Sequence, residues 1–278
     1  MASRRKRALP PWLQGTSVKK KTLEENICSN EEAVTKSDTQ IERSVDAKKT
    51  SDKQVERSFN AKKTSEEQGK VEWTAEEAVA MSYKEFLFQG CIIYSYDIND
   101  CNILCEEIII SIGTDNSNDV FIGFDSEWPV TYEKGAQAKT ALVQLCLNTE
   151  KCYLFHLSCM SKFPSMLKKL IEMENVKKVG LNVEYDIWKL GTDFDIKSKE
   201  VVQKSTVELR TLANKKLRSS ENWSLEGLTR NVLHRRISKD PSVRKCDWRQ
   251  FPLPETQQRY AATDAVVSLL LYQHLIKK

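Results

Sequence analysis

The apolar run Val120-Phe-Ile-Gly-Phe124, followed at once by Asp125-Ser-Glu127, constrains the fold more than any other part of this chain. The run is typical of a strand buried inside an α/β sheet. Residues two apart in a strand share one face, so Asp125 and Glu127 lie together at its carboxyl end, where such sheets place their sites. A divalent ion such as Mg²⁺ or Mn²⁺ would neutralise this pair of like charges. Two solvated acids at a strand end are the alternative interpretation of this motif taken alone.

A second carboxylate motif lies in Val179-Gly-Leu-Asn-Val-Glu-Tyr-Asp-Ile-Trp-Lys-Leu190. Its short apolar run changes into helical periodicity, which predicts a strand followed by a helix. Asp186 lies early in that helix, and Asn182 is the expected N-cap.

The third motif, Tyr260-Ala-Ala-Thr-Asp264, lies in the segment 254–276. A proline start, an acid in the first turn and apolar i, i+3, i+4 spacing predict one long helix there. A spacing of four residues places Tyr260 and Asp264 on the same helix face. The approach Trp248-Arg-Gln-Phe-Pro-Leu-Pro254 is fixed by its two prolines, and it either directs Tyr260 into a site or is purely structural.

Taken together, the three motifs resemble those of the DEDD exonucleases, in the order Asp-x-Glu, Asp, Tyr-x-x-x-Asp. The tyrosine is that of the DEDDy branch, because the sister branch has a histidine five residues before the last Asp, where this chain has Arg259. Further stretches at 141–146, 151–156 and 213–217 are similar to Werner-type exonuclease domains. The resemblance defines an expected exonuclease domain over residues 83–278.

The resemblance implies a ribonuclease H-like fold, in which α-helices flank a mixed β-sheet, and a 3′–5′ exonuclease that releases nucleoside monophosphates by two-metal-ion catalysis. It implies that Asp125 bridges two Mg²⁺ or Mn²⁺ ions, that Glu127 and Asp264 complete the first site, and that Asp186 serves the second. Tyr260 is expected to orient the attacking water, because a phenol with an ordinary pKa of about 10 is a poor base at neutral pH.

The order of secondary structure can also be predicted from the apolar periodicities. They indicate strands at about 91–96, 119–126, 141–148, 151–157 and 177–181 and helices at about 100–112 and 163–174, followed mainly by helices. Three consecutive strands with short connections predict an antiparallel meander, and the later alternation of strand and helix predicts parallel additions.

Residues 1–72 have a different composition, dense in Lys, Glu, Ser and Thr, with Trp12 and Phe59 as their two aromatics. Such a stretch cannot bury enough apolar surface to fold, so a disordered basic tail is expected. It holds a tandem 14-residue repeat, residues 41–54 and 55–68, and two polar copies do not make a solenoid. A solvated linker is the favoured interpretation, and a binding segment for replication or repair proteins is the alternative.

The basic run Arg4-Arg-Lys-Arg7 lacks the apolar segment of a secretory signal. With a nuclease it predicts import into the nucleus, and a phosphate-binding arm or a functionless terminus are the alternatives. No apolar run is long enough to span a membrane. The chain shows no Gly-x-x-x-x-Gly-Lys-[Ser/Thr] loop and ends about where the resemblance does, so a free-standing exonuclease without a helicase part is expected.

Charge is divided unevenly within the expected domain. Residues 73–133 carry one Lys against 12 acids, whereas residues 134–278 carry 26 basic residues against 15 acidic ones. A polyanion is therefore expected on the second part. The candidate nucleic-acid contacts are Trp128, Lys139, Lys215, Lys216, Arg218, Arg235, Arg236, Arg244, Lys245 and Arg249.

Eight cysteines occur without a CxxC pair, which indicates buried, reduced thiols in an intracellular protein. Cys152, His156 and Cys159 match no structural zinc spacing. No histidine stands beside a candidate nucleophile, so neither a Ser-His-Asp nor a Cys-His arrangement is expected.

Three functions are compatible with these features. The first is a DNA 3′–5′ exonuclease that acts on single-stranded or recessed 3′ ends in replication or repair, and the second is an RNA-trimming enzyme of the ribonuclease D type, which shares the motifs. The third is a catalytically inactive nucleic-acid-binding module, which the complete motif set disfavours. The Werner-like stretches favour DNA, and no RNP1 motif is visible, although sugar discrimination depends on 2′ contacts that a sequence does not display.

Overall fold

The structure is a computed structural model that describes residues 82–113, 118–131 and 138–278. The predicted tail, its repeat and its basic run therefore lie outside the described residues, and those predictions stay open. The strands are β1 (Cys91–Ser95), β2 (Val120–Glu127), β3 (Leu142–Asn148), β4 (Lys151–Phe155), β5 (Val176–Gly180) and β6 (Thr206–Glu208). The helices are α3 (Ile98–Ile112), η2 (Leu157–Cys159), α4 (Ser165–Glu172), α5 (Val183–Phe194), α6 (Ser198–Ser205), α7 (Leu209–Leu217), α8 (Leu225–Leu228), η3 (Thr229–Leu233), α9 (Pro241–Arg244) and α10 (Glu255–Leu275).

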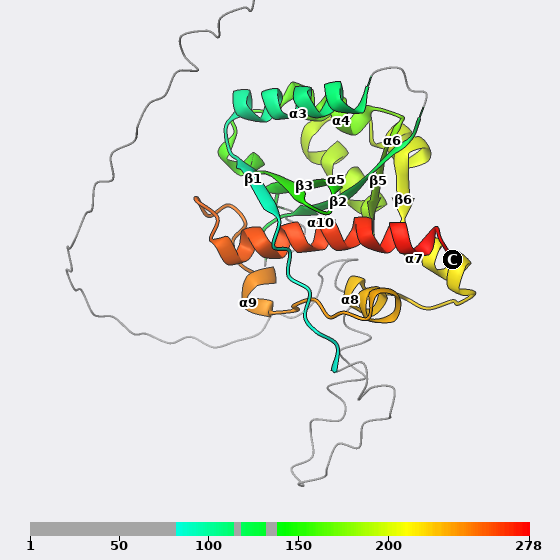
Figure 1. Cartoon of the computed structure of the whole chain (residues 1–278). Helices are drawn as coiled ribbons and strands as arrows, with labels where there is room; N and C mark the ends of the chain where they lie inside the picture. Colours follow the sequence, from blue (N-terminus) through cyan, green and yellow to red (C-terminus); the bar gives the residue numbers. More distant parts are fainter. Residues whose placement is uncertain (1–81, 114–117, 132–137) are drawn as a thin grey trace, which may run out of the picture. The chain divides into compact units, whose positions relative to one another are not determined.

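The six strands form one mixed sheet in the order β1-β4-β3-β2-β5-β6. Strands β2, β3 and β4 pair antiparallel, which confirms the predicted meander. Strands β5 and β6 extend it in parallel from β2, and β1 pairs in parallel with β4. Helix α10 covers one face of the sheet, and α3 and α4 cover the other (Figure 1). The predicted ribonuclease H-like architecture is thus confirmed.

The side chains of strand β2 alternate between the two faces of the sheet. Ile122 and Phe124 pack with α3, α4 and α5. Gly123 faces α10, where a Cβ atom would lie 2.0 Å from the carbonyl oxygen of Ala265. Because only glycine allows this approach, α10 lies directly against the strand that carries the Asp-x-Glu motif.

Some predicted boundaries differ from the structure. Strand β4 ends at Phe155 rather than at residue 157, because the chain turns there into η2 and leaves His156 outside the strand. Asn182 is the N-cap residue of α5, as predicted, but its backbone has φ 62° and ψ 25° and its side chain makes no cap hydrogen bond. Strand β6 has three residues, too few to show a periodicity. None of the described helices is long and apolar enough to cross a membrane.

Lys178, in the middle of β5, is a buried lysine. Its ammonium donates hydrogen bonds to the carbonyl oxygens of Ile171 and Val176 at 2.7 Å each, and to Ser205 Oγ at 2.8 Å. It therefore satisfies acceptors at the end of α4 and the start of β5. Burial, with a smaller contribution from the neighbouring Lys177, lowers the pKa of Lys178 to about 7.

This lowered pKa predicts a pH dependence of stability. In the unfolded chain the pKa of a lysine is about 10.4, so above about pH 7 the unfolded state holds a proton that the folded state has lost. The free energy of unfolding should therefore rise from about pH 7 to 8.5, by at most about 1.4 kcal/mol per pH unit. Urea unfolding of the wild type and of Lys178→Met measures this, and the variant should lose the rise. Equal slopes in both proteins would contradict the assignment.

Candidate active site

Two acids of β2 and one of α10 form a compact carboxylate cluster. Ligand atoms of Asp125, Glu127 and Asp264 all lie within 4.8 Å of one another. Asp125 and Glu127 lie on the strand face that Gly123 opens to α10, and Asp264 is buried on that helix. Three hard oxygen donors at this spacing fit a divalent cation, which also relieves their mutual repulsion.

Tyr260 lies on α10 one turn before Asp264 and packs beside the cluster. Burial is the main reason that its pKa lies well above the ordinary value, and the negative charges of Asp264 and Glu127 raise it further, against a smaller opposing effect of Arg244. The phenol is therefore neutral at physiological pH. It can orient a water molecule by hydrogen bonding and is unsuited to remove a proton as a base.

Asp186 reaches the site from the opposite face of the sheet. It lies on α5, is 1% exposed, and its Oδ1 accepts a hydrogen bond from Ser126 Oγ at 2.9 Å. Ser126 stands between the two acids of β2, and the alternation of the strand turns its side chain towards α5. The structure thus groups three of the four predicted carboxylates and holds the fourth at the strand end through Ser126.

Glu208 positions the start of α5, which carries Asp186. Its Oε1 accepts hydrogen bonds from the backbone N–H groups of Asn182 at 3.0 Å and Arg210 at 3.2 Å. Burial raises the pKa of Glu208, against the opposing effect of these two hydrogen bonds. Sequence reasoning missed both Ser126 and Glu208. The period-two alternation of β2 contains a signal for Ser126, whereas the role of Glu208 depends on a pairing of β5 with β6 that a local pattern does not reveal.

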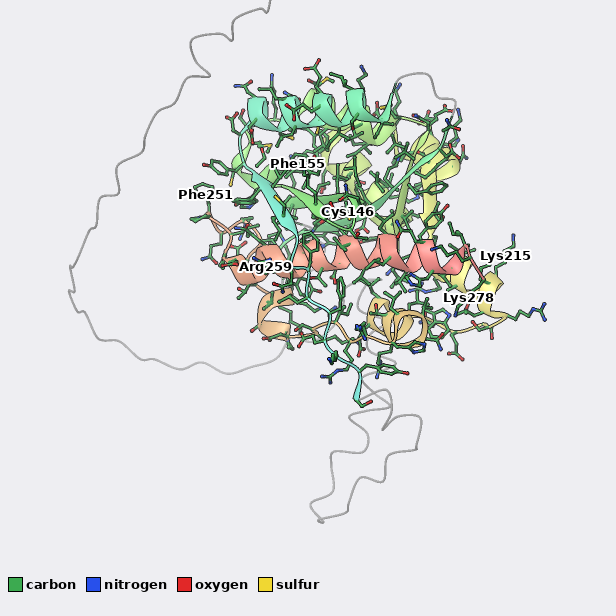
Figure 2. The ribbon with its side chains drawn as sticks, in the orientation of Figure 1. Cys146, Phe155, Lys215, Phe251, Arg259 and Lys278 are labelled. Atoms are coloured by element: carbon green, nitrogen blue, oxygen red, sulfur yellow. The ribbon has the colours of Figure 1, made fainter. Side chains whose placement is uncertain are left out.

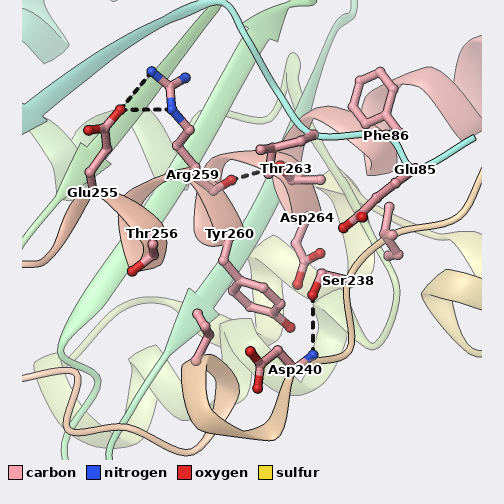
Figure 3. A pocket seen from close by; sticks show the side chains of 13 residues that line it. Glu85, Phe86, Ser238, Asp240, Glu255, Thr256, Arg259, Tyr260, Thr263 and Asp264 are labelled. Carbon is pink, nitrogen blue, oxygen red and sulfur yellow. Dashed lines mark hydrogen bonds and ion pairs between the residues drawn. The ribbon is translucent and has the colours of Figure 1, made fainter.

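A pocket of about 360 Å³ adjoins the cluster on the α10 side (Figure 3). Tyr260 and Asp264 form one wall of the pocket, so it opens onto the carboxylates. Beside that wall, Thr263 is buried, and its Oγ1 accepts a hydrogen bond from the Phe88 N–H at 3.0 Å. The remaining lining comes from the segments 85–87 and 237–243 and from Glu255, Thr256 and Arg259.

Two of the predicted nucleic-acid contacts, Trp128 and Arg244, lie near this site. Trp128 directly follows the motif on β2, and its ring centroid is 6.0 Å from that of Tyr185. Arg244, at the end of α9, is close enough to act electrostatically on Tyr260. Arg249 is exposed and forms an ion pair with Asp247 at 2.9 Å.

The α7 residues Lys215, Lys216 and Arg218 lie elsewhere. Lys216 Nζ is 3.5 Å from the carbonyl oxygen of Ile276, just beyond the end of α10. Ile276 is twelve residues beyond Asp264, or about 18 Å along the helix axis. Figure 2 shows Lys215 at the opposite end of α10 from Phe251. The structure does not bring these three basic residues together with the carboxylate cluster.

The four remaining members of the predicted basic set differ from one another in their surroundings. Lys139 is exposed, and its Nζ lies 5.9 Å from the centroid of the Phe194 ring. Lys245 is exposed directly after α9. Arg236 is partly committed to the fold, because its Nε donates to the carbonyl oxygen of Tyr83 at 3.1 Å, whereas Arg235 is exposed.

A ribonuclease H-like sheet whose central strand ends in clustered acids, with a tyrosine one helical turn from the last acid, is the arrangement of a metal-dependent nuclease. Comparison with known proteins agrees with this class. A sequence model of the 3′–5′ exonuclease family matches residues 96–278. The chain belongs to the 3′–5′ exonuclease family, a family of hydrolytic nucleases.

Named relatives carry the same description. The chain is 47% identical over 188 residues to the bifunctional 3′–5′ exonuclease/ATP-dependent helicase WRN of Mus musculus, a match that covers 68% of this chain and 13% of the mouse protein. It is 32% identical to a 3′–5′ exonuclease of Arabidopsis thaliana, over 70% of this chain and 67% of that protein. A 3′–5′ exonuclease of Drosophila erecta is 29% identical, and the match covers 69% of this chain and 54% of the fly protein. The chain thus spans a small part of the mouse protein and about half of the fly protein.

Solved structures share the fold at lower identity. The exonuclease domain of Aedes aegypti Nibbler has a TM-score of 0.55 at 19% identity, and the match covers 69% of this chain and 91% of that domain. Escherichia coli RNase D, an exoribonuclease, has a TM-score of 0.52 at 19% identity, over 68% of this chain and 44% of that one. At these identities the likeness concerns the fold alone.

Proposed function

We propose that this protein is a DNA 3′–5′ exonuclease that hydrolyses terminal nucleotides from single-stranded or recessed 3′ ends by two-metal-ion catalysis. The observation that supports it most is the grouping of Asp125, Glu127 and Asp264 within 4.8 Å, beside the phenol of Tyr260. A cluster of acids without a cation would repel the phosphate that it must approach. The carboxylates therefore serve a positively charged cofactor, for which Mg²⁺ or Mn²⁺ is the proposed choice.

The four motif carboxylates divide between two proposed ion sites. Asp125, Glu127 and Asp264 would hold the first ion, and Asp125 and Asp186 would hold the second. When bound, such ions activate water at neutral pH and stabilise the charge on the leaving 3′ oxygen. To do so, the Asp186 side chain would rotate away from its hydrogen bond with Ser126 and towards the cluster at the end of β2.

The other site residues orient the reactants. Tyr260 would donate or accept a hydrogen bond that aligns the attacking water with the phosphorus atom. Trp128 offers a ring for stacking on a base of the strand. Lys139, Arg244, Lys245 and Arg249 would contact the phosphates on the way to the site, and Lys215, Lys216 and Arg218 would contact nucleic acid only at a distance from the reacting phosphate.

The pocket beside Tyr260 and Asp264 would receive the terminal nucleoside. Phe86, Ile237 and Val243 give it apolar surface for a base or sugar. A nucleotide placed there would have its sugar and phosphate beside Tyr260 and Asp264, which line the same pocket.

The choice of DNA over RNA rests on the similarity of the chain to Werner-type domains. RNA trimming remains the second candidate, because ribonuclease D shares the motif set and this fold. A nuclear location agrees with the run 4–7, and the tail 1–72 would then be the part that binds replication or repair proteins. Both belong to this proposal.

A side-by-side degradation assay tests the function. Single-stranded DNA, 3′-recessed duplex DNA and RNA of matched sequence are incubated with the purified protein and with Mg²⁺, Mn²⁺ or EDTA. Stepwise shortening of DNA from the 3′ end, metal-dependent and faster than that of RNA, is the expected result. A DNA ending in an abasic residue should be shortened more slowly, because it leaves the pocket partly empty. Faster shortening of RNA would assign the second candidate, and binding without shortening would assign an inactive module.

A further inference from the structure

His156 is a fully buried histidine that the proposed mechanism does not use. Its Nε2 lies 2.9 Å from the carbonyl oxygen of Trp248, and its Nδ1 lies 2.6 Å from the hydroxyl of Tyr94. The Tyr94 oxygen also accepts a hydrogen bond from the N–H of Leu253 at 3.3 Å. These contacts define the tautomer: Nε2–H donates to the Trp248 carbonyl, and Nδ1 accepts the proton of the Tyr94 hydroxyl.

The surroundings keep this imidazole neutral. Burial lowers the pKa of His156, against a smaller opposing effect of the hydrogen bond to the Trp248 carbonyl. The groups that face the ring are the Tyr94 phenol from β1, the Cys159 thiol from η2 with its Sγ 3.3 Å from Nδ1, and the Phe251 ring at 6.4 Å. A neutral ring has one donor and one acceptor, and both are used.

The two contacts hold both ends of one segment, residues 248–253. Trp248 begins this segment and Leu253 ends it, two residues before the first residue of α10. The indole of Trp248 is fully buried, and its ring centroid lies 6.2 Å from that of Tyr260. The pair Tyr94–His156 therefore reaches Tyr260 in two ways, through the packing of Trp248 and through the position at which α10 begins.

We propose that Tyr94 and His156 are positioning residues that set the phenol of Tyr260 for catalysis by holding the 248–253 segment. They touch neither the carboxylates nor the pocket, and they act on the reaction through Tyr260. The inference rests on the role proposed above for Tyr260. The sequence alone left two roles open for the approach segment 248–254, directing Tyr260 into the site or a purely structural role. The proposal assigns it the first role.

A double-mutant cycle with Tyr260→Phe tests the proposal. His156→Phe and Tyr94→Phe are each made in the wild type and in the Tyr260→Phe variant, and kcat and KM are measured on single-stranded DNA. In the wild type we expect kcat to fall roughly 10-fold for His156→Phe and roughly 3-fold for Tyr94→Phe, with KM unchanged, because the water is misaligned and the DNA contacts are intact. In the Tyr260→Phe background both changes should cost less than about 2-fold, since the group that they position has gone.

Two further readouts separate positioning from damage to the fold. Mn²⁺ affinity, measured by calorimetry, should be the same in all variants, because the carboxylates are untouched. Tyr96→Phe is the matched control: it removes an exposed phenol from the same aromatic cluster and should leave kcat unchanged. If His156→Phe does not fold, Tyr94→Phe decides alone, since it removes one oxygen atom.

Equal losses of kcat in both backgrounds would overturn the proposal, because the pair would then act independently of Tyr260. Unchanged kcat in both single variants would overturn it as well. Full activity of Tyr260→Phe by itself would remove the role of Tyr260 from the proposed function and this inference with it. A loss confined to the background that retains Tyr260 is the result that supports the proposal.

Discussion

Asp125→Asn is expected to lower kcat for nucleotide release by at least about 10³-fold, because Asp125 would contact both ions and the carboxylates act as one unit. The substitution keeps the size of the side chain and removes its charge. Folding should persist, and the loss of charge repulsion should leave the protein at least as stable as the wild type. Single-turnover degradation of a labelled DNA strand, with thermal unfolding of the same sample, measures both quantities.

The residue just before the same strand offers a matched control for Asp125. Asp119 directly precedes β2, is half exposed, and forms an ion pair with Lys177 at 3.3 Å. Asp119→Asn makes the same chemical change away from the cluster and should leave kcat within about 2-fold of the wild type, because exposed ion pairs contribute little. Comparable activity in the two variants would rule out Asp125 as a ligand that the reaction needs.

Tyr260→Phe is expected to give the second largest effect, a fall in kcat of roughly 100-fold with KM for DNA nearly unchanged. The variant keeps the buried ring and loses the hydroxyl that orients water. Because burial and neighbouring carboxylates hold the pKa of Tyr260 well above its ordinary value, the wild-type rate should show no ionisation of this phenol near neutral pH. The pH profile of kcat checks that expectation.

Tyr272, on the same helix, supplies the control for this prediction. Its ring stacks on Phe121 with a centroid distance of 4.4 Å, away from the cluster. Tyr272→Phe should therefore retain wild-type kcat. A wild-type rate in Tyr260→Phe, or an equal loss in Tyr272→Phe, would mean that the Tyr260 hydroxyl has no special part in the reaction.

Local periodicity was sufficient to predict much of this architecture. The alternation in the segment 120–127 places Asp125 and Glu127 on one face, and the helical spacing of Tyr260 and Asp264 places them together. The two-residue connection between β3 and β4 likewise predicts their antiparallel pairing, which the structure contains. These features depend on residues close in sequence, which is why the sequence reveals them.

Contacts between distant segments were not predictable in the same way. The hydrogen bond from Ser126 to Asp186 spans 60 residues, and that from His156 to Trp248 spans 92. Both require the sheet and its helices to be assembled before the partners can be recognised. The position of the basic residues of α7 was unpredictable for the same reason. Counting charges along the chain does not predict that Lys216 lies beside the end of α10 that is distant from the carboxylates.

Anomalous diffraction from crystals that hold Mn²⁺ and a nucleoside monophosphate tests the central claim most directly. The proposed mechanism predicts two manganese peaks, one bound by Asp125, Glu127 and Asp264 and one bound by Asp125 and Asp186, with Asp186 turned away from Ser126. Nucleotide bound beside Tyr260 without a manganese peak at Asp125 and Glu127 would contradict two-ion catalysis at this site.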